Sequence, residues 1–451
     1  MQLIIPLKLF KTAIFKKIFY NAGILASGSV TSSIIGLVSF ALIARILEAE
    51  LFGVLALVQA YALIIDKILN FQSWQALIKY GSETLKDDRK EDLTSLLRLG
   101  FSLDVGTAIL ASVTGCILAY VVGYFLGWSD LKAQMASLFS IAILFNIEGT
   151  PTAILRLFNS FKHFAIGSVG AAILKLVLVV IGYYLESGLI YFVIVTMLSQ
   201  IGGYIYLILS SLSLLNKKKI GLGKYVPNYK EIKNTANSFE GLKSFIWTTN
   251  LHGTVRMATL NLDVILVDTL LGSVATGLYK VAKQFAKIFT QFSQPLYKSI
   301  YPELARLWSE NKTTEFASVI KKFSFITFIF GIIALLCFVV FGEDIIYLTV
   351  GENYLGSLPT LLWYLCGAVL SMTAFPITPA VLAMGYPRIS FKVLLLSTLL
   401  YFSFFFFLVE FFGLQGAGIS YLLLYIFWSI IMTFYYYKYL RKEVITNKNI
   451  E

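Results

Sequence analysis

Charged side chains are scarce in this sequence. Lysine, arginine, aspartate and glutamate together make up 14% of its 451 residues, against roughly 25% in soluble globular domains. Hydrophobic residues account for 58% of the chain, and the mean hydropathy is +0.78. This balance excludes a soluble globular domain and indicates an integral membrane protein.

Residues that serve redox, metal and nucleophile chemistry are equally scarce. The three cysteines, Cys116, Cys337 and Cys366, lie in apolar segments without disulfide or metal-ligand spacing. The two histidines, His163 and His252, are far apart in the sequence, and no GxSxG, Walker or Rossmann pattern is present. We therefore expect no metal, no cofactor and no catalytic site, and we predict that the protein is not an enzyme.

Long apolar runs are abundant. A membrane-spanning helix needs about 20 mainly apolar residues, and about twelve such runs follow one another along the chain. They lie at 22–46, 51–79, 98–126, 133–157, 163–185, 188–214, 243–270, 273–301, 318–341, 357–384, 388–412 and 414–438. Because irregular backbone is not tolerated against lipid, we expect an all-α, polytopic bundle with about twelve transmembrane helices.

The net charge of +12 is concentrated in alternate loops. Basic residues cluster before the first run, in the loops 79–98, 216–243 and 298–322, and in the tail after 438, whereas the loops between them hold few. Lysine and arginine mark the cytoplasmic ends of membrane helices. We therefore predict that both termini are cytoplasmic, and we interpret the positive charge as a topology signal rather than as nucleic-acid binding.

A loose internal repeat divides the chain. The segment 44–55 at the first hairpin resembles the segment 268–279 at the seventh-to-eighth hairpin, which makes Gly53 and Gly277 counterparts. Six helices per repeat would give both halves the same orientation, related by a pseudo-two-fold axis along the membrane normal.

The repeat boundary falls in the long basic loop. We expect an N-terminal lobe at 1–215 with helices one to six, a cytoplasmic linker at 216–242, and a C-terminal lobe at 243–451 with helices seven to twelve. The two six-helix lobes would surround a central lumen.

Three lysines interrupt the eighth run: Lys280, Lys283 and Lys287. At about 100° per residue they fall within one narrow stripe. A threonine and three glutamines extend this stripe: Thr276, Gln284, Gln291 and Gln294. Ionisable groups at bilayer depth are costly and rarely face lipid, so the stripe predicts a polar cavity that holds something anionic.

Two further helices carry polar stripes. The seventh run has Thr249, His252, Arg256, Thr259 and Asp263 on one face, and the second run has Gln59, Asp66, Asn70 and Ser73. Arg256 and Lys287 match in depth near the middle of the membrane, where two facing cations would repel unless an anion bridged them. Three polar stripes can line one lumen.

Acidic residues within the runs leave a structural alternative open. Asp66 beside Lys67, and Glu148, could form ion pairs that hold helices together, because intramembrane charges often pair with one another. Asp263 and Lys280 match in depth and could pair in the same way. Asp66, Asp263 and Glu148 are also the candidates for ion coupling. We set Asp104 and Asp268 aside because they lie near the expected helix ends.

The chain resembles the bacterial polysaccharide and O-antigen flippases of the multidrug/oligosaccharidyl-lipid/polysaccharide (MOP) exporter superfamily. The resemblance rests on the residues 44–47 and 51–53, on Gly277-Leu278-Tyr279 followed by Ala282, on the six-plus-six layout and on the basic cytoplasmic loops. It implies a lumen lined by helices one, two, seven and eight. Through this lumen an undecaprenyl-diphosphate-linked oligosaccharide, an O-antigen or capsular repeat unit, would cross from the inner to the outer leaflet of the cytoplasmic (inner) membrane by alternating access.

The resemblance also implies roles for particular residues. Basic lumen residues at the matching positions would bind the diphosphate: Arg256, Lys280, Lys283, Lys287 and Lys67. The sugars would contact amides on the same stripes: Gln284, Gln291 and Asn70. The implied partners are the lipid-linked oligosaccharide, membrane lipids, and the glycosyltransferases and polymerase of the same pathway.

Two alternatives remain from the sequence. A small-molecule (MATE-like) exporter of the same fold would be distinguished by an acidic lumen and by transport of cationic dyes. A membrane glycosyltransferase or polymerase would need carboxylates or a large soluble loop, whereas the longest loop, at 216–243, is lysine-rich with few acids. A scaffold that transports nothing belongs with the second alternative.

Overall fold

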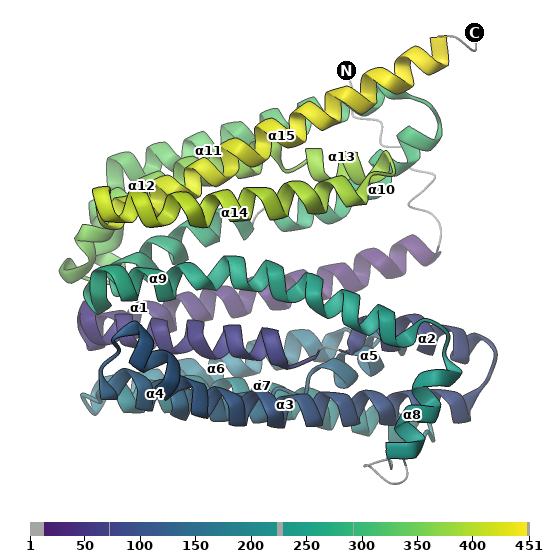
Figure 1. The fold of residues 1–451 in the computed structure, drawn as a ribbon, viewed down its shortest axis with the longest axis horizontal. Coiled ribbons are helices and arrows are strands. Elements are labelled where there is room, and N and C mark those ends of the chain that lie inside the picture. Colours follow the sequence, from purple (N-terminus) through teal and green to yellow (C-terminus); the bar gives the residue numbers. More distant parts are fainter. Residues whose placement is uncertain (1–12, 72, 223–228, 292, 449–451) are drawn as a thin grey trace. The chain divides into compact units, whose positions relative to one another are not determined.

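The computed structural model describes residues 13–71, 73–222, 229–291 and 293–448 (Figure 1). Within these ranges every regular element is helical, which confirms the predicted all-α class. The elements in chain order are α1 (Ala13–Leu69), α2 (Trp74–Lys86), α3 (Lys90–Leu126), α4 (Asp130–Ser140), η2 (Ile141–Phe145), α5 (Gly149–Leu157), α6 (Lys162–Tyr184), α7 (Leu189–Lys217), α8 (Tyr229–Ser238), α9 (Leu242–Gln291), α10 (Ser293–Ser309), α11 (Thr313–Thr349), η3 (Glu352–Ser357), α12 (Leu358–Ala374), α13 (Ile377–Ala383), α14 (Pro387–Phe412) and α15 (Leu414–Lys448).

Among the described residues, 10 helical stretches are long and apolar enough to cross a membrane. The prediction of about twelve is therefore not confirmed as a count. The difference arises at α1 and α9, each of which contains a kink, at Glu48 (φ 56°) and at Gly272 (φ 82°). The 57 residues of α1 would extend about 85 Å if straight, far more than the hydrocarbon thickness of about 30 Å.

Two predicted runs are also broken inside the membrane. The run 51–79 ends as a helix at Leu69 and resumes at Trp74, and the run 133–157 passes from α4 through η2 to α5. Non-helical backbone at membrane depth is tolerated only where protein surrounds it or where it lines a cavity. We therefore expect these two breaks to be buried inside the protein.

The chain folds as two compact units. Unit 1 contains the residues up to Leu47 together with Leu57–Ile265, and unit 2 contains Glu48–Ala56 together with the residues from Leu266 onward. These units differ from the predicted lobes because α8 and the first part of α9 belong to unit 1, and a short piece of α1 belongs to unit 2. The lobe boundaries at 215 and 243 stay a prediction.

In unit 1, α3 packs along α4 and η2, α2 packs against α5, and α6 runs beside α7 (Figure 1). One buried cluster joins α2, α3 and the start of α9 through Leu77, Leu96 and Leu242. The Tyr80 hydroxyl donates to the Glu240 carbonyl at 2.7 Å and attaches α2 to the segment before α9. This framework holds the ends of α1 and α5 in place.

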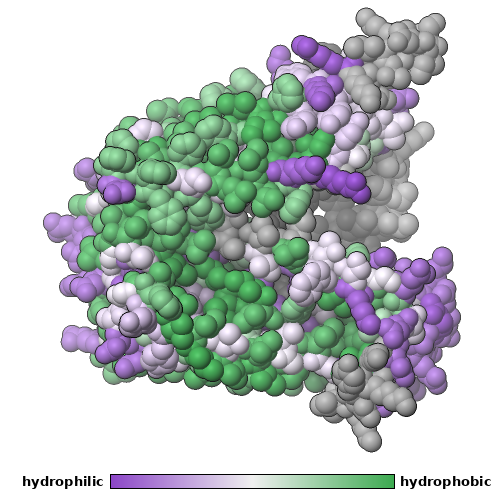
Figure 2. Space-filling model, in the orientation of Figure 1, coloured by the Kyte–Doolittle hydropathy of each residue, from purple (hydrophilic) through white to green (hydrophobic). Residues whose placement is uncertain are grey.

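In unit 2, α15 lies between α12 and α14, and α11 packs on α12 (Figure 1). Large hydrophobic side chains such as Phe407 and Ile333 are exposed on the outer faces. In each unit taken by itself, hydrophobic residues cover the middle of the visible face and hydrophilic residues gather at the helix ends (Figure 2). This distribution suits a multi-pass membrane protein whose outer faces contact lipid.

Gly53 and Gly277 allow two backbones of unit 2 to meet. A Cβ at Gly53 would collide with the Ser273 carbonyl oxygen, and a Cβ at Gly277 would collide with the Ala49 carbonyl oxygen. Each glycine follows its kink by the same interval, from 48 to 53 and from 272 to 277. The contact is thus reciprocal, in the register of the internal repeat.

Candidate functional site

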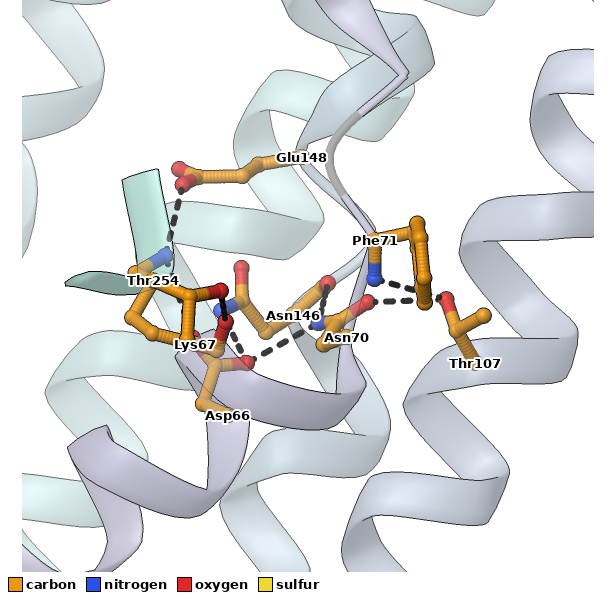
Figure 3. A network of polar contacts seen from close by, with 8 residues as sticks. All are labelled: Asp66, Lys67, Asn70, Phe71, Thr107, Asn146, Glu148 and Thr254. Atoms are coloured by element: carbon orange, nitrogen blue, oxygen red, sulfur yellow. Dashed lines mark hydrogen bonds and ion pairs between the residues drawn. The ribbon is translucent and has the colours of Figure 1, made fainter. Parts of the chain in front are cut away.

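A buried polar network lies where α1 ends and the fourth predicted span is broken (Figure 3). The Asp66 carboxylate, 5% exposed, is its centre: Oδ1 accepts from Asn70 Nδ2 at 2.9 Å and from Asn146 Nδ2 at 2.8 Å. Asn70 Nδ2 also donates to the Asn146 carbonyl at 2.9 Å. The residues after α1 and after η2 therefore bond to each other, as burial favours, although Asn146 Oδ1 has no hydrogen-bond partner among the described residues.

Thr107 extends the network onto α3. Its hydroxyl lies 3.1 Å from Asn70 Oδ1 and accepts from the Phe71 amide at 3.2 Å. Asn70, which sequence analysis placed among the sugar contacts, is thus bonded on both sides and only 5% exposed. Its role toward a sugar stays a prediction.

Lys67 occupies the acidic side of the network. Its Nζ lies 3.1 Å from Asp66 Oδ2 and 4.0 Å from Glu148 Oε1, at the break before α5. Thr254 on α9 donates to the Lys67 carbonyl at 2.6 Å and attaches that residue from a third helix. In this structure the ammonium has acidic neighbours, the arrangement that the structural alternative describes.

Asp104, which we set aside as a helix-end residue, is 1% exposed. It accepts from Ser73 Oγ at 2.7 Å, from Thr150 Oγ1 at 2.7 Å and from the Thr150 amide at 2.5 Å. The carboxylate thus lies at the N-terminus of α5, where the helix dipole favours negative charge. A Cβ on Gly149 would lie 2.6 Å from Asp104 Oδ1, so this approach requires glycine. The hydroxyl residues Ser73 and Thr150, next to the two breaks, are the sequence signal that could have predicted the role of Asp104.

The lysine stripe lies on α9 within unit 2. Exposure rises along it: Thr276 is fully buried, Lys280, Lys283 and Gln284 are half-buried, and Lys287 is exposed. The opposite face of the helix is buried through Tyr279, Ala282, Phe285 and Ala286. The helix therefore turns its cationic face away from the packing of its own unit.

Aromatic residues support the stripe from behind. Lys283 Nζ lies 5.5 Å from the Tyr279 ring centroid, a cation–π distance. Tyr279 and Tyr364 share a hydroxyl–hydroxyl hydrogen bond at 2.5 Å, and the Tyr364 ring stacks on Tyr421 with centroids 4.2 Å apart. These contacts fix the rotation of α9 and hence the direction of the stripe.

For the other predicted site residues, the contacts described within each unit do not join them to the lysine stripe. The side chains of Arg256 and Gln291 lie outside the described residues. Asp263 is 3% exposed, and its Oδ1 accepts from the Val264 amide at 2.9 Å. Asp263 belongs to unit 1 and Lys280 to unit 2, so their predicted pairing stays a prediction.

Sequence comparison identifies relatives. A family model described as "Polysaccharide biosynthesis protein" matches residues 18–308. Inner membrane protein YghQ of Escherichia coli (strain K12) is 28% identical over 347 residues, covering 77% of this chain and 96% of that protein. Capsular polysaccharide biosynthesis protein CapF of Staphylococcus aureus is 23% identical over 336 residues, covering 74% of this chain and 81% of that protein.

Solved structures show the same fold. An inward-facing multidrug resistance MATE family transporter of the MOP superfamily matches with a TM-score of 0.71 and 12% identity, covering 92% of this chain and 96% of the other. The lipid II flippase MurJ in its inward closed conformation matches with a TM-score of 0.69 and 16% identity, covering 93% and 90%. At these identities the likeness establishes the fold, that of MOP-type transporters.

Proposed function

The chain belongs to the polysaccharide biosynthesis protein family, and from that premise we propose that it is a flippase for an undecaprenyl-diphosphate-linked oligosaccharide. The family and the fold make it a MOP-type, multi-pass inner membrane transporter. The finer proposal names the cargo, its direction from the inner to the outer leaflet, and the residues that bind it. A transport role also means that we propose no catalytic activity for the protein.

The cationic stripe on α9 is the observation that carries the proposal. Lys280, Lys283 and Lys287 share one helix face that is progressively exposed, while the opposite face is packed. Three like charges within two helical turns repel one another at low dielectric, and an anion at the stripe would relieve that repulsion. A diphosphate carries the charge that such a stripe complements.

We assign the parts of the cargo by their chemistry. Lys287, Lys283 and Arg256 bind the diphosphate as it enters from the cytoplasmic side, and Gln284 and Gln291 bind sugar hydroxyls. The polyprenyl tail stays in lipid throughout, because it is as apolar as the bilayer. Alternating access then exposes the same site to the outer leaflet.

The membrane potential favours this direction. An anion that moves outward across a cell-negative membrane gains up to about 2.3 kcal/mol per charge per 100 mV when it crosses the whole field. Ion coupling by Asp66, Glu148 or Asp263 is thus an addition to the mechanism and not a requirement of it.

The comparisons support this cargo over a small cationic drug. CapF is named for capsular polysaccharide biosynthesis, and MurJ is named as a lipid II flippase. The equally close fold of a multidrug transporter keeps a small-molecule exporter as the second candidate. The basic stripe argues against it, because a cation exporter needs the opposite charge.

Charge reversal at the stripe tests the proposal. Lys283→Glu and Lys287→Glu should abolish surface polysaccharide in a complementation assay at near-normal membrane abundance, because a carboxylate repels the diphosphate. Lys283→Arg and Lys287→Arg should retain part of the export, since the charge is kept and the geometry changes. Lys321→Glu, at an exposed position on α11, is the matched control and should export normally. Normal export by both glutamate variants would refute the site.

A further inference from the structure

A groove follows the C-terminal half of α15, within unit 2. Its volume is about 940 Å³, and every described residue that lines it belongs to α15. Ile430 and Phe434, four residues apart on one face of the helix, are each 62% exposed. Ser429 and Thr433 lie beside them, half-buried, and their small side chains leave room between the larger ones. This part of the groove suits an acyl chain.

The same groove ends at two basic residues. Lys438 and Arg441, which are three residues apart and both exposed, line its end. Lys438 Nζ lies 6.0 Å from the ring centroids of both Tyr435 and Tyr439, at a cation–π distance. Tyr439 in turn stacks on Tyr386, the residue before α14, with ring centroids 3.7 Å apart. These rings hold the lysine at the end of the groove.

The order of side chains along α15 matches the parts of a phospholipid. At about 1.5 Å per residue, Lys438 lies roughly 36 Å from Leu414 at the start of the helix, beyond a hydrocarbon thickness of about 30 Å. Ile430 lies roughly 24 Å from Leu414 by the same measure, within the hydrocarbon. Tyr437 lines the groove between the two, where aromatic residues mark the membrane interface. In unit 2, hydrophilic residues likewise gather at the helix ends (Figure 2).

We propose that this groove binds an anionic glycerophospholipid of the leaflet at the basic end of α15, which we predict to be the cytoplasmic leaflet. An acyl chain lies against Ile430 and Phe434, and the phosphate contacts Lys438 and Arg441. The guanidinium pairs with two phosphate oxygens, and the ammonium acts as a point charge. Charge complementarity favours an anionic lipid, because the phosphate of a zwitterionic lipid is already balanced by its own amine.

A lipid in the groove would stabilise unit 2, because the opposite face of α15 is part of the core of that unit. Met432 and Tyr436 are buried in one hydrophobic cluster with Ile300 and Leu304 of α10. A ligand that binds α15 from the lipid side therefore favours the packed arrangement of these helices. The inference is independent of the proposed cargo, because the groove lies on α15 and the lysine stripe on α9.

Thermal unfolding of the purified full-length protein in detergent tests the site. Phosphatidylglycerol should raise the thermal midpoint by a few degrees, whereas phosphatidylcholine at the same concentration should not. A basic residue near an anionic lipid contributes about five-fold in affinity. Lys438→Gln and Arg441→Gln should therefore each raise the phosphatidylglycerol concentration for half the shift about five-fold, and the double variant about 25-fold.

The matched control is Lys321→Gln with Lys322→Gln. It removes two exposed lysines of α11 outside the groove and should respond to phosphatidylglycerol as the parent does. A parent that does not respond to phosphatidylglycerol would overturn the proposal, as would a double variant at 438 and 441 that responds like the control. Should the double variant not accumulate, each single variant still carries the test through its five-fold change.

Two other ligands distinguish a lipid from related anions. Glycerol 3-phosphate carries the phosphate without acyl chains and should not shift the midpoint; a shift equal to that of phosphatidylglycerol would indicate a free-anion site and overturn the proposal. A midpoint that rises with undecaprenyl phosphate but not with phosphatidylglycerol would assign the groove to the cargo and overturn it too. Loss of the lipid response would leave the flippase proposal standing, and failed charge reversal at the stripe would leave this site standing.

Discussion

At the scale of single residues, unit 1 buries carboxylates within its membrane helices, where an unpaired polar group would cost the most free energy. Asp66 and Asp104 are 5% and 1% exposed, and every bond described for them comes from a residue at a helix break. A buried polar group without a partner costs about 1–3 kcal/mol, whereas a typical hydrogen bond contributes about 0.5–1.5 kcal/mol net. The identity of the small residues beside these carboxylates therefore matters as much as that of the donors.

Gly149→Ala should destabilise unit 1. The added Cβ would lie 2.6 Å from Asp104 Oδ1, so either α5 or the carboxylate must move and the bonds to Thr150 lengthen. We expect a loss of about 1–3 kcal/mol, the usual range for overpacking a buried site. Thermal unfolding in detergent measures it.

The matched control for this variant is Gly106→Ala on α3. No atom lies within 4 Å of a Cβ at Gly106, so alanine there should be neutral or slightly stabilising through its helix propensity. Equal midpoints for the two alanine variants would contradict the close packing of Asp104 against Gly149.

At the scale of elements, breaks and kinks decide which backbone groups of a helix are available to bond with other residues. α1 and α9 change direction at Glu48 and Gly272, both with positive φ, and the span from α4 to α5 unwinds at residues 146–148. A regular helix would use its own backbone groups internally and could not offer the Asn146 carbonyl to Asn70. The interruptions are therefore the parts of these helices that bind other groups.

The reciprocal glycine contact of unit 2 gives a paired prediction. Gly53→Ala and Gly277→Ala should each lower the thermal midpoint, and by similar amounts, because each Cβ meets a backbone carbonyl that cannot rotate away. Since both changes force the same pair of backbones apart, the double variant should cost less than the sum of the two. Gly36→Ala, at a position on α1 with no atom within 4 Å of its Cβ, is the control. Strictly additive effects would mean that the two contacts are independent.

At the scale of the whole molecule, the two units differ in the charge they bury. Unit 1 contains the network of Asp66, Lys67 and Glu148, in which two carboxylates approach one ammonium, whereas the α9 stripe of unit 2 presents three lysines on one face, with Lys280 and Lys283 half-buried and Lys287 exposed. Like positive charges gathered on one helix face suit an anionic cargo, whereas opposite charges that pair with one another suit a structural role. We therefore assign cargo binding first to the α9 stripe.

Topology is the prediction at this scale. Reporter fusions after residue 448 and within the loop 216–242 should both report a cytoplasmic location, because the basic loops follow one another in alternation along the chain. A fusion in the short connection between α3 and α4, near Ser129, should report the opposite side. A periplasmic tail would invert the orientation proposed for the cargo.

The sequence by itself determined the fold class, the membrane location and the lysine stripe. These follow from local properties: apolar run length, the placement of basic residues, and the period of about 3.6 residues that sets Lys280, Lys283 and Lys287 on one face. The internal repeat was visible in the same way, and Gly53 and Gly277 meet their partners in its register.

Only the tertiary structure decided which polar residues meet. Asp104 joins Ser73 and Thr150, and Asn146 joins Asp66 and Asn70, across sequence separations that no helical period reaches. The end of α1 at Leu69 and the break at residues 146–148 could not be predicted either, because hydropathy measures only how apolar a run is. Whether a run stays helical at membrane depth depends on partners from other helices for its backbone groups, and those partners exist only in the folded chain.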